Sequence, residues 1–236
     1  MNGFAYFVGG VLPYIAVPIF LIGMIYRLLA WRKAPQPGKM TLFPAPGGVV
    51  GGTISEVLFF PSLFRGDKLL WFFSWTFHAS LALIFVGHFR VVTGLIDSVL
   101  ISLGLSTAGV TALSTYSGTA AGVLMLASGG VLLLRRLGMQ RVREITSFGD
   151  FFALLLVLAI VLTGDLMRLL PGAHVSLEQT RIWAASLVTF SPAVSKLPLM
   201  FLVHALLGQL LFMYIPFSKI LHLGGIFFTQ PLIQRR

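Results

Sequence analysis

The chain has 236 residues, of which 57% are hydrophobic and only 10% are charged, and it contains no cysteine. A soluble domain carries roughly 25% charged residues, so this composition excludes an ordinary soluble protein and indicates an integral membrane protein. Without cysteine the chain can hold neither an iron–sulfur cluster nor a cysteine-bound zinc ion, and any such cluster has to belong to a partner.

Long apolar runs predict membrane helices, because a helix needs roughly 20 apolar residues to cross about 30 Å of hydrocarbon. We expect an all-α integral membrane protein, a five-transmembrane-helix bundle that forms a single domain over residues 1–236. Small residues in the third span suit a close approach of helices or a flat ligand against the backbone. The expected spans are approximately 4–31, 69–92, 112–134, 151–170 and 197–223, with a basic, Pro/Gly-rich cytoplasmic loop at 32–68.

The net charge of +10 comes from Lys and Arg residues that gather at one end of the expected bundle. Thirteen of the 17 fall in residues 27–68, in residues 135–143 and near the C-terminus, and the other four fall on the opposite side. This positive-inside bias predicts that the N-terminus faces outside and the C-terminus faces the cytoplasm. We therefore predict a multi-pass protein of the inner (cytoplasmic) membrane, surrounded by lipid and without a nucleic-acid partner.

Four histidines lie within two of the expected spans. His78 and His88 are ten residues apart in LLWFFSWTFHASLALIFVGHFRVV, and His204 and His222 are eighteen apart in LPLMFLVHALLGQLLFMYIPFSKILH. An imidazole in hydrocarbon is costly without a partner, and a haem iron in a helix bundle takes one nitrogen from each of two facing helices. Since the two spans run antiparallel, His78 and His222 fall at the inner depth, and His88 and His204 at the outer depth. The pattern predicts two haems.

If both spans were continuous helices, His78 and His88 would be about 15 Å apart along the helix axis, and His204 and His222 about 27 Å apart. Helix tilt and side-chain reach would have to absorb the difference. A histidine within a membrane can also serve as a hydrogen-bonded structural group or as part of a proton relay. His174 falls outside the expected spans, and we interpret it as a loop residue.

Charged residues near the span ends are further candidates for the site. Asp165, near the outer end of the fourth expected span, is either a boundary charge or a group that handles protons near a quinone. Asp165 and Arg90 are our candidates for a quinone site near the outer haem. Arginines at the membrane boundary either set topology or pair with haem propionates, and the candidates for pairing are Arg27, Arg90, Arg135 and Arg136.

Four segments resemble the gamma subunit family of respiratory nitrate reductase, whose members are five-helix di-haem cytochromes b. The segments are PYIAVPIFLIGMIYR, HASLALIFVGHF, ASGGVLLLRR and HALLGQLLFMYIPFSKILH, and both histidine spacings agree with that family. EVLFFPSLFR and FSKILHLGGIFF look more like the DsrM-type cytochrome b of the Dsr sulfur-metabolism membrane complex. The resemblance implies that His88 and His204 bind the outer haem b, and that His78 and His222 bind the inner one.

The resemblance also implies an activity. Such a subunit exchanges electrons between the quinone pool, menaquinone included, and a cytoplasmic iron–sulfur subunit similar to heterodisulfide reductase, within a multi-subunit oxidoreductase. Two alternatives to this interpretation stay open. In the first, which is in the same redox class, the chain is the gamma subunit of a respiratory nitrate reductase. In the second, it is a non-redox membrane anchor or transporter whose histidines serve structure or proton transfer.

Overall fold

The computed structural model describes residues 3–34 and 48–233, and these residues form helices without any β-strand. Five helical stretches within them are long and apolar enough to span a membrane, which confirms the expected all-helical membrane protein. Lys39, Arg235 and Arg236, which contribute to the charge bias, lie outside the described residues, as does the middle of the expected loop. The spans are Gly3–Lys33, Lys68–Val92, Thr107–Gly138, Phe148–Leu169 and Leu199–Phe217.

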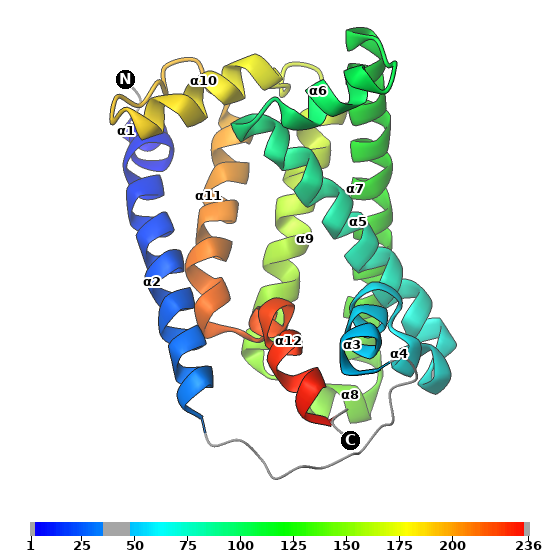
Figure 1. The fold of residues 1–236 in the computed structure, drawn as a ribbon. Helices are drawn as coiled ribbons and strands as arrows, with labels where there is room; N and C mark the ends of the chain where they lie inside the picture. Colours follow the sequence, from blue (N-terminus) through cyan, green and yellow to red (C-terminus); the bar gives the residue numbers. More distant parts are fainter. Residues whose placement is uncertain (1–2, 35–47, 234–236) are drawn as a thin grey trace.

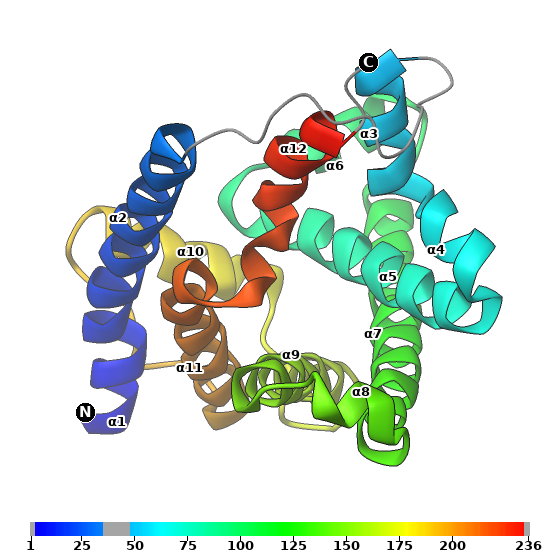
Figure 2. The same ribbon diagram turned by 90° about the horizontal axis from the view of Figure 1, so that it is seen from below.

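The spans pack in a chain of neighbours. Helix α5 lies along α7, α7 lies against α9, α9 against α11, and α11 against α2. Viewed along the bundle, α12 lies between α11 and α5 (Figure 2). The two histidine-bearing spans, α5 and α11, are therefore linked through α7 and α9. The bounds are α2 (Leu12–Lys33), α5 (Lys68–Val92), α7 (Thr107–Gly138), α9 (Phe148–Leu169), α11 (Leu199–Tyr214) and α12 (His222–Ile233).

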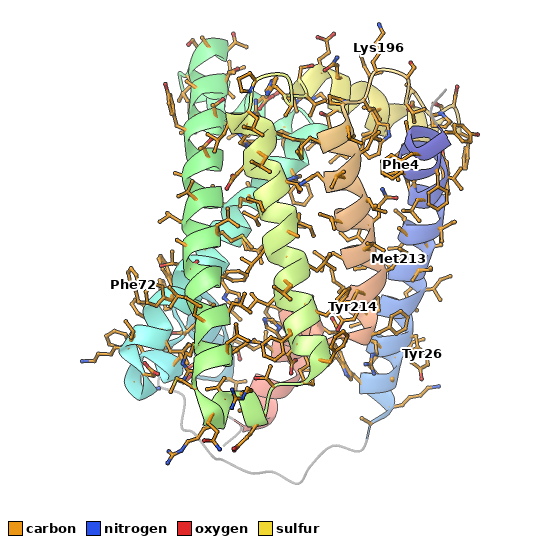
Figure 3. All side chains as sticks on the ribbon, turned by 180° about the vertical axis from the view of Figure 1, so that it is seen from behind. Phe4, Tyr26, Phe72, Lys196, Met213 and Tyr214 are labelled. Atoms are coloured by element: carbon orange, nitrogen blue, oxygen red, sulfur yellow. The ribbon has the colours of Figure 1, made fainter. Side chains whose placement is uncertain are left out.

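Short helices cover the two ends of the bundle (Figure 1). The N-terminus, α6 (Leu95–Ser102) and α10 (Leu177–Val188) lie at one end, which we call the α10 end. Phe4 and Lys196 lie near it, whereas Tyr26 and Phe72 lie toward the opposite end, which we call the α12 end (Figure 3). Besides α12, that end holds α3 (Gly48–Phe59), α4 (Pro61–Gly66) and α8 (Gln140–Glu144).

The first span begins with α1 (Gly3–Tyr6) and a π-helical turn, η1 (Phe7–Val11). Pro13 has no backbone N–H, so the carbonyl of Gly9 lacks its usual helical partner. The indole N–H of Trp183 in α10 donates to that carbonyl at 2.8 Å, and the amide of Gln209 in α11 donates to the carbonyl of Val8 at 3.1 Å. The neighbouring helices thereby stabilise the irregular turn within an apolar environment.

Residues 48–66 of the expected loop fold as α3 and α4. Helix α4 packs on the start of α5, and α3 packs on α12. Asp67 caps the start of α5, and its carboxylate accepts from a first-turn backbone N–H at 2.9 Å. The indole N–H groups of Trp71 and Trp75 donate to the carbonyls of Phe59 and Leu58 at 2.7 and 2.9 Å. These carbonyls have no partner within α3, so the tryptophans satisfy them and hold α3 against α5.

Glycines allow α7 to approach α9 closely, as the small residues of the third span predict. A Cβ atom at Gly129 would lie 2.5 Å from the Leu158 side chain, and one at Gly122 would overlap the Asp165 carboxylate. Larger residues at either position would separate the helices. The adjoining apolar core of α5, α7 and α9 consists of Phe77, Met125, Leu154 and Val161.

The expected fifth helix over residues 197–223 is not continuous. Helix α11 ends at Tyr214, two 3₁₀ turns follow at Ile215–Phe217 and Lys219–Leu221, and α12 starts at His222. Pro216 cannot donate the N–H that a continuous helix requires. Its ring packs on Gly23 of α2, where a Cβ atom would lie only 2.6 Å away, and Arg27 Nε donates to its carbonyl at 2.9 Å. The axial separation of about 27 Å, which assumes a straight helix, therefore does not apply.

Candidate functional site

The structure brings the four histidines together as two pairs at two depths. The rings of His88 in α5 and His204 in α11 have centroids 6.2 Å apart and planes inclined by 13°. The rings of His78 in α5 and His222 at the start of α12 have centroids 5.9 Å apart and planes inclined by 76°. We call these the α10-end pair and the α12-end pair.

All four imidazoles hold Nδ1 within hydrogen-bond distance of a backbone carbonyl. A carbonyl only accepts, so Nδ1 carries the proton and Nε2 keeps a free lone pair at every one of these positions. Metal-bound histidines typically donate their other ring N–H in this way. The partners are Ser74 for His78 at 2.7 Å, Ile84 for His88 at 2.8 Å, Lys219 for His222 at 2.9 Å and Ile160 for His204 at 3.0 Å.

The distances within the pairs fit one metal ion between two imidazoles. A bond from a metal to an imidazole nitrogen is about 2 Å long, which places the centroids of two opposed rings roughly 6 Å apart. Among residues 3–34 and 48–233, no group of three or more His, Cys, Asp or Glu side chains could hold a metal ion. Two imidazoles that face each other across about 6 Å are a donor set that fits haem iron.

The surroundings of the pairs also leave room for a flat ligand. Gly87 adjoins His88 and Gly208 lies one turn after His204, and a Cβ atom at either glycine would have no neighbouring atom within 4 Å. Only 11% of the most apolar 18-residue stretch of α5 is buried within the chain, compared with 39% of the corresponding stretch of the first span. Helix α5 therefore keeps apolar surface that a macrocycle or lipid can cover.

Helix α9 contributes to the α10-end pair although it carries no histidine. Thr163 Oγ1 lies 3.0 Å from His204 Nδ1, next to the contact with the Ile160 carbonyl. A Cβ atom at Gly164 would lie 3.3 Å from His204 Cε1, so glycine lets the ring sit close to α9. The only signal for these residues in the sequence is a weak one, a Thr-Gly step inside an apolar span.

The α12-end pair is bordered by aromatic side chains. Phe60 and Phe77 contact His78 edge to face, with centroids 5.3 and 5.4 Å away. Phe60 lies at the junction of α3 and α4 and has a left-handed backbone with φ of 50°. This kink, in a segment expected to be a loop, places the ring beside His78.

Three of the predicted propionate partners contact other groups of the chain. Arg27 donates to the carbonyl of Pro216, at the break in the fifth span. Arg135 lies 3.7 Å from the carboxylate of Asp67, and Arg136 donates to the carbonyl of Asp150 at 3.1 Å. Each contact uses only part of a guanidinium group that has five N–H donors. Pairing with a propionate stays a prediction for these residues.

Arg90 takes part in an ion-pair cluster at the α10 end. Its Nε donates to Asp97 at 2.5 Å, while Arg181 donates to the same carboxylate at 3.0 Å and to the Arg90 carbonyl at 2.8 Å. The hydrogen bond from Arg90 is the main cause that lowers the pKa of Asp97 from its ordinary value of 3.8. The cluster joins the end of α5 to α6 and α10, two residues beyond His88.

Asp165 is buried, with 5% of its surface exposed, and its Oδ2 has no hydrogen-bond partner. A Cβ atom at its neighbour Gly164 would lie 3.3 Å from the His204 ring, and the carboxylate itself packs on Gly122. A boundary charge would extend to water, whereas a buried acid in a membrane helix is typical of a functional group. His174 is exposed in the connection between α9 and α10, as expected for a loop residue.

Five apolar spans with histidines paired at two depths define a helical membrane protein of the cytochrome b kind. The sequence profile of the nitrate reductase gamma subunit family matches residues 61–234, and the chain belongs to this family. It is a membrane electron-transfer subunit, a multi-pass protein of the inner membrane.

Relatives of two kinds support this assignment. The Hdr-like menaquinol oxidoreductase cytochrome b-like subunit of Archaeoglobus fulgidus is 31% identical, over 94% of this chain and 77% of its own length. The respiratory nitrate reductase 1 gamma chain of Escherichia coli is 29% identical, over 91% of this chain and 88% of its own. The nitrate reductase gamma chain of Bacillus subtilis is 28% identical, over 94% and 91%.

Proposed function

We propose that the chain is a di-haem b membrane subunit that exchanges electrons between menaquinone and a cytoplasmic iron–sulfur protein. His88 and His204 would hold an outer haem, and His78 and His222 would hold an inner haem. The observation that carries the proposal is the distance of about 6 Å between paired rings, whose Nδ1 atoms are all held by carbonyls. When bound, the two haems would supply one-electron redox centres at two depths of the membrane.

Haem content tests this proposal directly. The purified complex should give a haemochrome spectrum of haem b, with two haems per copy of this chain. A complex without haem b would overturn the proposal. If the chain were instead a non-redox anchor or transporter, quinone-linked electron flow through the complex would persist after each of the four histidines is replaced by alanine.

We further propose that the α12 end faces the cytoplasm, so that the N-terminus is outside and the C-terminus inside. The support is the excess of Lys and Arg at this end. Because the chain has no cysteine, single cysteines can report sidedness without background. A membrane-impermeant thiol reagent added to intact cells should label Ser102→Cys in α6 and not Gln140→Cys in α8. The reverse pattern would overturn this topology.

The electron partner is proposed to be a heterodisulfide-reductase-like iron–sulfur subunit of a Dsr-type sulfur-metabolism complex. The support is the name and the 31% identity of the Archaeoglobus relative, together with the absence of cysteine from this chain. The second candidate is a respiratory nitrate reductase, favoured by the relatives from Escherichia coli and Bacillus subtilis. Purification through a tag on this chain distinguishes them, since a nitrate reductase would bring a large molybdenum protein.

For the quinone site, the contacts favour Asp165 over Arg90. Arg90 is already paired with Asp97, whereas Asp165 has a carboxylate oxygen without a partner. Quinol oxidation releases protons, and a carboxylate near the outer haem can hold one of them. We propose that Asp165 has this role, and that the Arg90 cluster keeps the end of α5 in place.

A further inference from the structure

One histidine of the four is held differently from the others. His78, His88 and His222 bond to carbonyls three or four residues earlier in their own chain segment. His204 bonds instead to the Ile160 carbonyl of α9, which is 44 residues away in the sequence. The orientation of this ring therefore depends on how α9 packs against α11.

The hydroxyl of Thr163 adds a second contact to the same nitrogen. Thr163 Oγ1 lies 2.9 Å from the Ile160 carbonyl, 3.0 Å from the Ala159 carbonyl and 3.0 Å from His204 Nδ1. A hydroxyl has one proton, and the carbonyls can only accept, so that proton goes to a carbonyl of α9. The hydroxyl oxygen then accepts from the Nδ1–H of His204. This N–H is consequently shared between two acceptors, the hydroxyl and the Ile160 carbonyl.

We propose that Thr163 is a positioning residue that makes His204 a stronger electron donor than the other three histidines and so lowers the redox potential of the outer centre. The inference deepens the proposed function and rests on it. Its physical basis is that a second acceptor on Nδ1–H draws the proton away from the ring, which strengthens the Nε2 donor and favours the oxidised metal. Gly164 supports this arrangement because any side chain there would press on the His204 ring.

The test uses Thr163→Val in the intact, purified complex. Valine has nearly the shape of threonine but cannot accept from Nδ1–H, while Thr163→Ser keeps the hydroxyl. Thr115→Val is the matched control, since Thr115 also bonds its hydroxyl to the carbonyl four residues earlier in a membrane helix, at 3.0 Å. The measurements are an optical redox titration of both haems and the electron paramagnetic resonance spectrum of the oxidised complex.

Thr163→Val should shift the outer haem to a more positive potential and change its resonance spectrum, with the inner haem unchanged. Thr163→Ser should restore the wild-type values, and Thr115→Val should retain them. Loss of the outer haem in Thr163→Val, with retention in Thr163→Ser, would support the positioning role, because it would show that the hydroxyl is needed to hold His204 toward the haem.

Several results would overturn the inference. They are an unchanged outer potential in Thr163→Val, an equal shift of both haems, or the same loss of haem in Thr163→Val and Thr163→Ser. These results would leave the two-haem proposal in place. A wild-type complex that contains no haem would overturn both, so the two failures are distinguishable.

Discussion

The two histidine pairs differ in how the chain holds them. The α10-end pair joins two long helices, has nearly parallel rings and relies on α9 to orient His204. The α12-end pair joins α5 to a short helix that starts after a break, and its rings are nearly perpendicular. One pair therefore depends on packing between helices, whereas the other depends on the local turn at Pro216. Changes in the two regions should affect the two proposed haems separately.

The largest effect should come from removing one ligand. His204→Ala should remove the outer haem and leave the inner haem largely present, while His78→Ala should do the opposite, because each haem would lose one of the two histidines proposed to hold it. Optical spectra of the purified variants, with haem quantified per chain, measure this. His174→Ala is the control and should keep both haems. Loss of both haems in each ligand variant would show that the haems are coupled to folding and would contradict the separation.

The next effect concerns proton transfer at the outer haem. Asp165→Asn has nearly the same shape but does not accept a proton at neutral pH, so quinol-linked electron transfer should fall about a hundredfold, as expected for a lost general base. Stopped-flow reduction of the haems by a menaquinol analogue measures the rate, and the haem spectra should stay unchanged. Asp150→Asn, at the α12 end, is a control that should retain the rate. A wild-type rate in Asp165→Asn would exclude this role.

A smaller effect should follow from crowding the break in the fifth span. Gly23→Ala places a Cβ atom 2.6 Å from the Pro216 ring, which should cost about 1–3 kcal/mol and disturb the inner haem more than the outer one. Thermal unfolding and haem spectra measure the two consequences. Gly130→Ala is the matched control, since a Cβ atom there meets nothing within 4 Å and alanine favours the helix. If Gly23→Ala and Gly130→Ala had the same thermal stability and the same haem spectra, the contact between Gly23 and Pro216 would not have the importance assigned to it.

The smallest effect concerns the ion pairs that join α5, α6 and α10. The pKa of Asp97 is lower in the folded chain than its ordinary value of 3.8, so the cluster stabilises the fold above that value and loses its contribution as pH falls through the folded pKa. These side chains are partly exposed, so the contribution should be below about 1 kcal/mol. Thermal melts of wild type and Asp97→Asn should differ at pH 7, and the difference should shrink as pH falls below 3.8 toward the lower pKa of the folded chain. A difference that is independent of pH would contradict this origin.

Much of the fold could be predicted from the sequence because membrane spans are specified by long apolar runs. The structure has five apolar spans, as expected, but two of them differ from the expected bounds by four to six residues at an end. Helix α7 extends from Thr107 to Gly138, and the fifth span, Leu199–Phe217, stops at the break. Helices α3 and α4 were not predicted, because the end of α3 is satisfied by indole hydrogen bonds from Trp71 and Trp75, which follow their partners by 12 and 17 residues. The break at Pro216 had a local signal in the proline itself, but its position also depends on contact with Gly23 of another helix.

The sequence by itself determined the class of protein and which histidines share a depth, since apolar length and antiparallel order do not depend on packing detail. Only the tertiary structure decided which carbonyl holds His204, that Asp165 is buried beside Gly122, and that Arg90 pairs with Asp97 and Arg181. Hydrogen bonds and ion pairs need a particular atom within about 3 Å, and residues far apart in the chain reach that distance only when helices pack.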